Sequence, residues 1–241
     1  MIERIAHITD LHLDEAFPYN DKSSARERFC KVLEHIAQQG ITNIVCTGDI
    51  GTNEGVPYFF DLLKKMKLSL TLGNHDSFNE VSKHYEKGEQ VGHKTNKMYW
   101  SEVRDFFKLV FLDSSAGAID LEQINWLKKQ LVTAQPIIIF LHHPIIGLPF
   151  KVDDMGKLKN RKKVLELLSK VPNKITVFCG HYHMESNLSY ENITQCISPA
   201  VVYQIKKTKD TLAIDTKNFG YRIIQMEPHQ LTSKVEMFHA D

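Results

Sequence analysis

Long hydrophobic runs, an excess of one charge and abundant cysteine are all missing from this sequence. No apolar stretch approaches the roughly 18 to 20 residues that would cross a bilayer, so the chain is not expected to span a membrane. Its 30 Lys and Arg residues balance 29 Asp and Glu residues, without basic blocks. This balance gives no electrostatic reason to expect a nucleic acid or a membrane surface as partner.

The cysteines are few and scattered. The four (Cys30, Cys46, Cys179 and Cys196) form no Cys-x-x-Cys motif, which indicates reduced structural thiols. The N-terminus also lacks a basic segment followed by an apolar stretch, so the cytoplasm is the expected compartment. At 42% apolar and 24% charged residues, the composition is that of a globular protein, and the length predicts a single domain over residues 1–241.

Short apolar runs alternate with helical patterns along most of the chain. One helix is predicted over Ser24 to Gln39, opened by a Ser24–Glu27 capping box and ended at Gly40, and Asp120 is expected to cap another over Leu121 to Leu131. The apolar runs are Ile5 to Thr9, Ile41 to Cys46, Leu68 to Leu72, Ile137 to Leu141 and Ile175 to Cys179, and the two other helices lie over Val56 to Met66 and Lys162 to Lys170. The alternation predicts an α/β fold with a largely parallel sheet.

Two regions depart from this alternation. Met98 to Val103 and Phe107 to Leu112 are typical of a hairpin. After Leu188 the chain is rich in strand-like segments, namely Val201 to Ile205, Thr211 to Ile214, Tyr221 to Met226 and Ser233 to Phe238. These late segments predict a second, more antiparallel sheet.

The sequence is rich in histidine, with 12 residues, and polar clusters follow five predicted strands. The clusters are Asp10-Leu-His12, Gly48-Asp49, Gly73-Asn74-His75-Asp76, His142-His143 and His181-Tyr-His183. An isolated Asp-x-His is a common surface pair, Gly-Asp is a common turn and His-His can be a buried histidine beside an exposed one, whereas Gly-Asn-His-Asp is rare by chance. Their shared position is not ordinary. Because the carboxyl ends of parallel strands meet at one edge, the clusters are expected to converge there.

These clusters supply carboxylates, imidazoles and one amide oxygen, but no thiolate. The seven candidate ligands are Asp10, His12, Asp49, Asn74, His142, His181 and His183. Such donors suit first-row ions, and two ions can share a bridging carboxylate at roughly 3.5 to 4 Å. A pair of cations polarises a phosphoryl oxygen and lowers the pKa of a bridging water that attacks it. The donor set therefore predicts hydrolysis of a phosphoester.

With these motifs in this order, the sequence resembles the calcineurin-like metallophosphoesterases. The resemblance implies a two-sheet β-sandwich flanked by helices, with two Mn, Fe or Zn ions at its strand ends. By motif position it implies that Asp10, His12 and His183 hold one metal, that Asn74, His142 and His181 hold the other, and that Asp49 bridges them. It also implies that His75 contacts the phosphate with Asn74 and protonates the leaving oxygen, and that Asp76 orients His75.

Within that superfamily the sequence is most similar to the class III cyclic-nucleotide phosphodiesterases. The similarity includes Leu112-Asp113-Ser114, Gln123-x-x-Trp126-Leu127 and Phe219-Gly-Tyr221-Arg222. The group usually has His-His-Pro-Pro where this chain has His142-His143-Pro144-Ile145. This difference leaves open whether His143 touches substrate or only supports a neighbouring ligand. Pro144 to Lys159, the longest stretch without a pattern, is expected to be the loop that contacts the base.

The substrate is expected to be a 3′,5′-cyclic nucleotide or a related small phosphodiester. A protein phosphatase would carry Asp-Arg-Gly after Gly-Asp, where this chain has Ile50-Gly51-Thr52. A lipid A pathway pyrophosphohydrolase would usually carry Arg in place of His75, and a repair nuclease would have a further domain. A phosphomonoesterase, a nucleotide pyrophosphohydrolase and a metal-binding scaffold without catalysis remain as alternatives.

Overall fold

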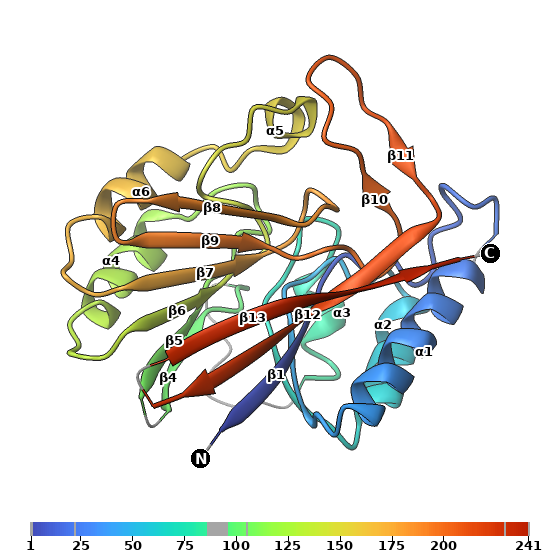
Figure 1. Cartoon of the computed structure of the whole chain (residues 1–241), viewed down its shortest axis with the longest axis horizontal. Coiled ribbons are helices and arrows are strands. Elements are labelled where there is room, and N and C mark those ends of the chain that lie inside the picture. The colour runs from blue at the N-terminus through green and yellow to red at the C-terminus, as the bar shows by residue number, and fades with distance from the viewer. Residues whose placement is uncertain (1, 22, 86–95, 105, 229, 241) are drawn as a thin grey trace.

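The computed structural model describes residues 2–21, 23–85, 96–104, 106–228 and 230–240, and they form two mixed β-sheets packed face to face (Figure 1). Strands of the first sheet lie in the order β13 (Gln230–His239), β12 (Asn218–Glu227), β1 (Glu3–Ile8), β2 (Asn43–Cys46) and β3 (Lys67–Leu70). The three N-terminal strands run parallel, and β12 joins β1 in antiparallel register, with Ala6 opposite Ile223. The edge of β1 is thus paired rather than left open.

The second sheet has the same plan of a parallel centre with antiparallel edges. Its order is β4 (Trp100–Arg104), β5 (Phe107–Phe111), β6 (Ile137–Phe140), β7 (Ile175–Cys179), β9 (Ile193–Ile197) and β8 (Ser186–Tyr190). The predicted hairpin is confirmed as β4 and β5, which pair antiparallel. β5, β6, β7 and β9 run parallel, and β8 returns antiparallel along the far edge.

The prediction of one parallel sheet and a separate antiparallel sheet was wrong. The predicted parallel strands divide between the two sheets, and the late segments Tyr221 to Met226 and Ser233 to Phe238 lie in β12 and β13 of the first sheet. The reason is that a strand buried on both faces has the same apolar pattern in either sheet. Of the late segments, two are shorter than predicted and form the small ribbon β10 (Gln204–Ile205) and β11 (Ile214–Asp215).

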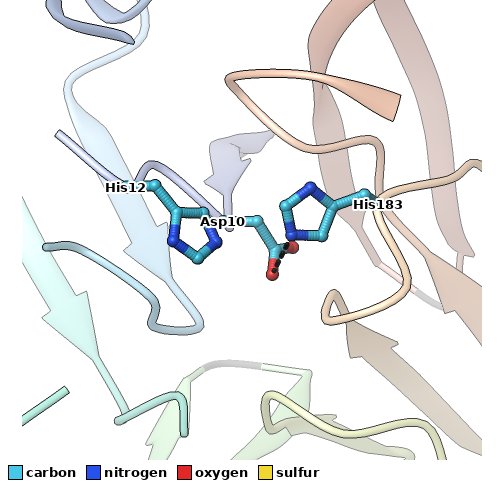
Figure 2. A group of neighbouring side chains, drawn as sticks. All are labelled: Asp10, His12 and His183. Carbon is cyan, nitrogen blue, oxygen red and sulfur yellow. Dashed lines mark ion pairs between the residues drawn. The ribbon is translucent and has the colours of Figure 1, made fainter. Parts of the chain in front are cut away.

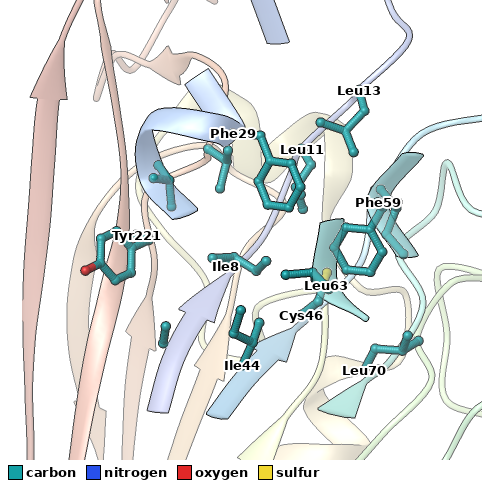
Figure 3. Packing of buried hydrophobic residues seen from close by; sticks show 14 of the residues in the cluster. Ile8, Leu11, Leu13, Phe29, Ile44, Cys46, Phe59, Leu63, Leu70 and Tyr221 are labelled. Atoms are coloured by element: carbon teal, nitrogen blue, oxygen red, sulfur yellow. The ribbon is translucent and has the colours of Figure 1, made fainter. Parts of the chain in front are cut away.

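Helices cover the outer face of each sheet, which makes four layers and confirms the sandwich that the resemblance implied. α1 (Ser23–Gln38) and α2 (Gly55–Leu63) cover the first sheet, and α4 (Leu121–Gln130) and α6 (Arg161–Leu168) cover the second (Figure 1). Figure 3 shows Phe29 of α1 and Phe59 of α2 above Ile44 and Leu70 of the first sheet. Among the described residues, no helix is long and apolar enough to span a membrane.

The ends of the helices show which local signals were correct. Gly40 has a φ of +66° after α1, and Asp120 accepts a hydrogen bond from the backbone N–H of Gln123, as expected. The predicted capping box was wrong, since Asp21 accepts from the backbone N–H groups of Ser23 and Ser24 and the helix begins earlier. The short helices are α3 (Phe78–Val81) and α5 (Lys151–Gly156), and the latter lies within the stretch expected to be a loop.

Aromatic and branched side chains fill the space between the two sheets. Trp100, Phe111, Phe140 and Phe178 of the second sheet form a row of rings, with Trp100 stacked on Phe111 at 3.9 Å between centroids. They pack against Ile5, Val45, Ile224 and Met226 of the first sheet. This core fixes the two sheets against each other, so the ends of strands from both sheets meet along one edge.

Candidate metal centre

Loops that leave five strands deliver the predicted ligands to that edge. Asp10 and His12 follow β1, Asp49 follows β2, Asn74 follows β3, His142 follows β6, and His181 and His183 follow β7. Left-handed backbone is adopted by Asp10, His12, Asp49, His181 and His183, with φ between 44° and 70°. A non-glycine residue seldom adopts this conformation, and such strain gathers at functional sites. The loops therefore hold their side chains in place against a local backbone cost.

The glycines of these motifs are required by close approach. A Cβ on Gly73 would lie 2.1 Å from the Oδ1 of Asp49, and one on Gly180 would lie 2.5 Å from the Oδ2 of Asp10. Only glycine leaves room for these carboxylates. The glycine of Gly-Asn-His-Asp and the glycine before His181 are thus required for the carboxylates to fit at these positions.

Asp10, His12 and His183 form the first group of ligands, which Figure 2 shows pointing toward one another. One potential ligand atom from each lies within 4.8 Å of the others, and the Nε2 of His183 is 3.5 Å from the Oδ1 of Asp10. The Nε2 of His12 is buried and has no hydrogen-bond partner among the described residues. A buried nitrogen without a partner, aimed at carboxylates, fits a metal ion.

Asp49, His142 and His181 form the second group, with their ligand atoms also within 4.8 Å. The Nε2 of His142 is 3.1 Å from the Oδ1 of Asn74, 3.1 Å from the Nδ1 of His181 and 3.2 Å from the Oδ2 of Asp49. Four donors thus face one small space. The Oδ1 of Asn74 offers this group a neutral oxygen, and its role as a ligand stays a prediction.

Asp49 connects the two groups. Its Oδ2 lies 3.2 Å from the Nε2 of His142 and 3.7 Å from the Nε2 of His12. One carboxylate oxygen therefore faces both groups at once. This is the position that a bridging ligand occupies in a two-metal site.

Backbone carbonyls fix the outer nitrogens of three imidazoles. The Nδ1 of His142 donates to the carbonyl of Thr47 at 2.9 Å, and the Nε2 of His181 donates to that of Gly156 at 2.8 Å. The Nδ1 of His183 donates to the carbonyl of Tyr203 at 3.2 Å. Because the outer nitrogen carries the proton, the inner nitrogen keeps its lone pair for a metal, which is the usual arrangement behind metal-binding histidines.

The carboxylates make the centre attractive to positive charge. Burial lowers the pKa of His142, but the charge of Asp49 outweighs it and raises that pKa to about 9. Burial also lowers the pKa of His12. The hydrogen bond to Glu15 and the charge of Asp49 outweigh this effect and raise the pKa to about 9. Without metal, protons on these imidazoles supply the positive charge that the carboxylates require. Two cations at the same place would replace them.

His75 lies at the open side of the centre. Its side chain is 51% exposed, and its backbone N–H donates to the Oδ1 of Asp49 at 2.9 Å. The Nδ1 of its ring is 3.7 Å from the Oε1 of Glu15. The backbone of His75 is thus fixed to Asp49, while its ring is accessible to a bound molecule.

Asp76 acts on the backbone of the ligand loops. Its carboxylate accepts hydrogen bonds of 2.8 Å from the N–H groups of Gly73, Asp49 and Ile50. Burial and the nearby charge of Asp49 raise the pKa of Asp76 to about 7. The resemblance implied that Asp76 orients His75, but the acidic side chain beside that ring is Glu15. Asp76 joins the loop of Asp49 to the loop that carries Asn74 and His75, and an orienting effect on the His75 ring stays a prediction.

His143 is buried and packs against the ring of His181. It is 3% exposed, its Nδ1 is 2.9 Å from the Oγ of Ser114, and its ring lies 4.1 Å from the ring of His181. Burial and the charges of His142 and His181 lower the pKa of His143 to about 2, so the ring is neutral. A contact of His143 with substrate stays a prediction.

Sequence reasoning missed Glu15 and Tyr203. Glu15 lies three residues after His12, a spacing too common to be a signal by itself, and Tyr203 lies in a segment predicted only as a strand. Both become visible when the loops meet, because Glu15 contacts the rings of His12 and His75 and Tyr203 contacts the ring of His183 at 4.4 Å.

Comparison with known proteins identifies the family. A model of the calcineurin-like phosphoesterases matches residues 3–185, which include every candidate ligand. The chain belongs to this family. It is therefore a metal-dependent phosphoester hydrolase, and the predicted resemblance is confirmed.

Individual relatives span nearly the whole chain. A protein of Fibrobacter succinogenes named a probable cyclic nucleotide phosphodiesterase is 24% identical, covering 96% of this chain and 93% of its own. A glycerophosphodiester phosphodiesterase of Enterobacter lignolyticus is 27% identical, covering 83% and 78%. Among solved structures, a dimetal phosphatase of Danio rerio shares the fold, with a TM-score of 0.68 at 12% identity over 98% of both chains.

Proposed function

We propose that this enzyme is a dinuclear phosphodiesterase, with 3′,5′-cyclic nucleotides as its first substrate class. The observation that carries the proposal is the position of Asp49, whose Oδ2 faces both His12 and His142. A carboxylate shared between two histidine groups suits two adjacent cations and has little use in a protein that only binds a partner. This favours catalysis over a metal-binding scaffold.

Seven side chains would hold the two ions. Asp10, His12 and His183 would hold the first, and Asn74, His142 and His181 the second, with Asp49 between them. Nitrogen and oxygen donors without thiolate suit Mn, Fe or Zn. Such a pair of ions, when bound, polarises a phosphoryl oxygen and lowers the pKa of a bound water toward neutrality.

His75 would supply the proton for the leaving oxygen. Its backbone is fixed to Asp49, and its half-exposed ring stands beside the first group, 5.1 Å from the ring of His12. A substrate phosphate over the centre would place its leaving oxygen on this open side. General acid assistance of this kind matters most when the leaving group is a poor one.

Aromatic side chains beside the first group support a substrate with a planar base. The ring of Tyr203 lies 4.4 Å from that of His183, and Phe17 lies 6.3 Å from Tyr203 with 64% of its surface exposed. A nucleobase could stack on such rings. Pro144 to Lys159, predicted to contact the base, borders the second group instead, where Gly156 meets His181.

A diester is proposed rather than a monoester because binding energy accelerates a reaction only when it stabilises the transition state more than the bound substrate. A monoester carries one more ionisable oxygen, which would bind both cations tightly before reaction. Tight ground-state binding does not by itself accelerate turnover. We therefore expect a higher kcat/KM for diesters.

The test is a screen of the Mn-reconstituted enzyme, with Asp49→Asn as the inactive control. Substrates are 3′,5′-cyclic and 2′,3′-cyclic nucleotides, glycerophosphodiesters and monoesters. We expect bis-nitrophenyl phosphate to exceed nitrophenyl phosphate in kcat/KM, and cyclic AMP to exceed AMP. Preference for the monoester in both pairs would contradict the phosphodiesterase proposal.

Glycerophosphodiesters are a second substrate class, favoured by the name of the Enterobacter relative. Phe17→Ala separates the two classes, since Phe17 is exposed and outside the candidate ligand set. If cyclic nucleotides stack there, KM should rise for cyclic AMP by about 2- to 10-fold, which corresponds to the 0.5 to 1.5 kcal/mol of an aromatic contact. The KM for a glycerophosphodiester should not change in Phe17→Ala.

A further inference from the structure

One carboxylate links the first group of ligands to His75. The Oε1 of Glu15 lies 2.8 Å from the Nδ1 of His12 and 3.7 Å from the Nδ1 of His75. The backbone N–H of Glu15 also donates to the carbonyl of His12 at 3.1 Å. This tight turn folds the glutamate back onto the histidine that precedes it by three residues.

The contact decides which nitrogen of His12 can bind a metal. An ionised carboxylate only accepts hydrogen bonds, so the Nδ1 of His12 carries the proton. The lone pair then lies on the Nε2, which is buried, has no partner among the described residues and is 3.7 Å from the Oδ2 of Asp49. His142, His181 and His183 obtain the same result from backbone carbonyls, whereas His12 obtains it from a side chain.

The same oxygen restricts the ring of His75. That ring is half-exposed, and its backbone is fixed by the hydrogen bond to Asp49. With its Nδ1 turned toward Glu15, its Nε2 is the nitrogen left to meet a leaving group. The two rings lie edge to face at 5.1 Å between centroids, and the Nδ1 of each lies within 3.7 Å of the Oε1 of Glu15.

We propose that Glu15 is a positioning residue that sets the tautomer of His12 for the first metal and aims the ring of His75. The role toward His12 stands on the metal centre alone, while the role toward His75 rests on the proposed function. Glu15 is accessible to mutation without disturbing the core, since its side chain is 30% exposed.

The first test uses metal-free protein at a pH above the His12 pKa of about 9, so that this imidazole is neutral and has a defined tautomer, and it does not require a substrate. Nitrogen-15 NMR of the histidine rings should show His12 protonated at Nδ1 in the wild type and in Glu15→Gln, whose amide oxygen still accepts. Glu15→Ala should give a mixture of tautomers. Glu34→Ala, which removes an exposed glutamate of α1, is the matched control. An unchanged tautomer in Glu15→Ala would overturn the proposal.

The second test is calorimetric titration with Mn²⁺. Loss of a partner behind a metal-binding histidine typically costs about 10- to 100-fold in affinity, so one of the two binding steps should weaken by that factor in Glu15→Ala. The other step should stay unchanged, and Glu15→Gln should recover most of the loss. Equal affinities in Glu15→Ala and Glu34→Ala would overturn the role toward His12.

The third test isolates the role toward His75. At saturating metal, Glu15→Ala should lower kcat more for an alkyl diester than for a nitrophenyl diester, with KM little changed. In a His75→Ala background the same change should show no such dependence on the leaving group. If the dependence persists without His75, the link between Glu15 and His75 is wrong, while the NMR and calorimetric results stand on their own.

Discussion

The two groups of ligands differ in what stands behind them. In the second group the backbone holds both imidazoles, through the carbonyls of Thr47 and Gly156, and His143 packs on His181. In the first group a backbone carbonyl, that of Tyr203, holds only His183, whereas a partly exposed side chain, Glu15, holds His12. The exposed residues Phe17 and His75 lie nearby. The three donors of the first group are buried, whereas the second group includes the exposed Asn74, so the first group differs in its accessible neighbours Glu15, Phe17 and His75. The comparison teaches that binding and reactivity are separable by mutation.

The largest effect should come from Asp49→Asn, which removes the feature that both groups share. Loss of the shared charge leaves the two cations without the carboxylate that offsets their repulsion. We expect metal content to fall and activity to drop by more than about 100-fold, beyond the usual cost of losing an outer partner. Metal analysis of the purified variant checks this. Two ions per chain in Asp49→Asn would show that the bridging assignment is wrong.

His75→Ala should affect only the open side. We expect kcat to fall by about 10² to 10⁴, the usual size of general acid assistance, with both metals retained. The loss should shrink when nitrophenolate is the leaving group. Equal losses for good and poor leaving groups, measured at the same metal content, would argue against a general-acid role.

Gly156→Ala should affect only the second group of ligands. A Cβ at this position would lie 2.5 Å from the Nε2 of His181 and would displace the ring from the carbonyl that orients it. We expect about a 10- to 100-fold loss of affinity in one Mn²⁺ binding step, with the tautomer of His12 unchanged. Calorimetry of this variant beside Glu15→Ala sharpens the comparison, because the double variant should weaken both steps. If Gly156→Ala and Glu15→Ala weaken the same step, the division into two groups fails.

The smallest effect concerns His7, a buried residue of β1 outside both groups of ligands. His7 is fully buried between the sheets, with its ring nitrogens 2.7 Å from the Oγ of Ser198 and 3.0 Å from the Oγ1 of Thr47. Burial and the charge of Arg222 lower the pKa of His7 from 6.5 to about 3. As the pH falls from 6.5 toward 3, the unfolded chain takes up a proton here that the folded chain refuses, so stability falls.

His7→Gln should remove this dependence. The slope of unfolding free energy against pH, measured by urea titration of metal-free protein between pH 6.5 and 4, should flatten by up to about 1.4 kcal/mol per pH unit. The two Mn²⁺ binding steps should be unchanged in His7→Gln. An unchanged slope would mean that His7 is protonated in the folded protein.

Much of the site could be predicted from sequence because its signal is local. The polar clusters after β1, β2, β3, β6 and β7 are contiguous, and the rule that parallel strands end at one edge brings them together. The division of strands between two sheets could not be predicted in this way. Ala6 pairs with Ile223, more than 200 residues away, and nothing in either segment names its partner.

Glu15 illustrates the same limit within the site. His12 and Glu15 are close in sequence, but the proposed role of Glu15 also involves His75. His75 lies in the loop after β3, and its contact with Glu15 depends on the fold. Short elements were also beyond local reasoning, since the six residues of α5 are stabilised by their place beside the second group more than by their own helical pattern.

The most direct test of the account is anomalous scattering from crystals of the Mn-reconstituted enzyme. Two peaks are expected, one among Asp10, His12 and His183 and the other among Asn74, His142 and His181. The carboxylate of Asp49 should lie between them, with a separation of roughly 3.5 to 4 Å. A single peak, or two peaks that do not share Asp49, would contradict the dinuclear centre on which the proposed phosphodiesterase activity depends.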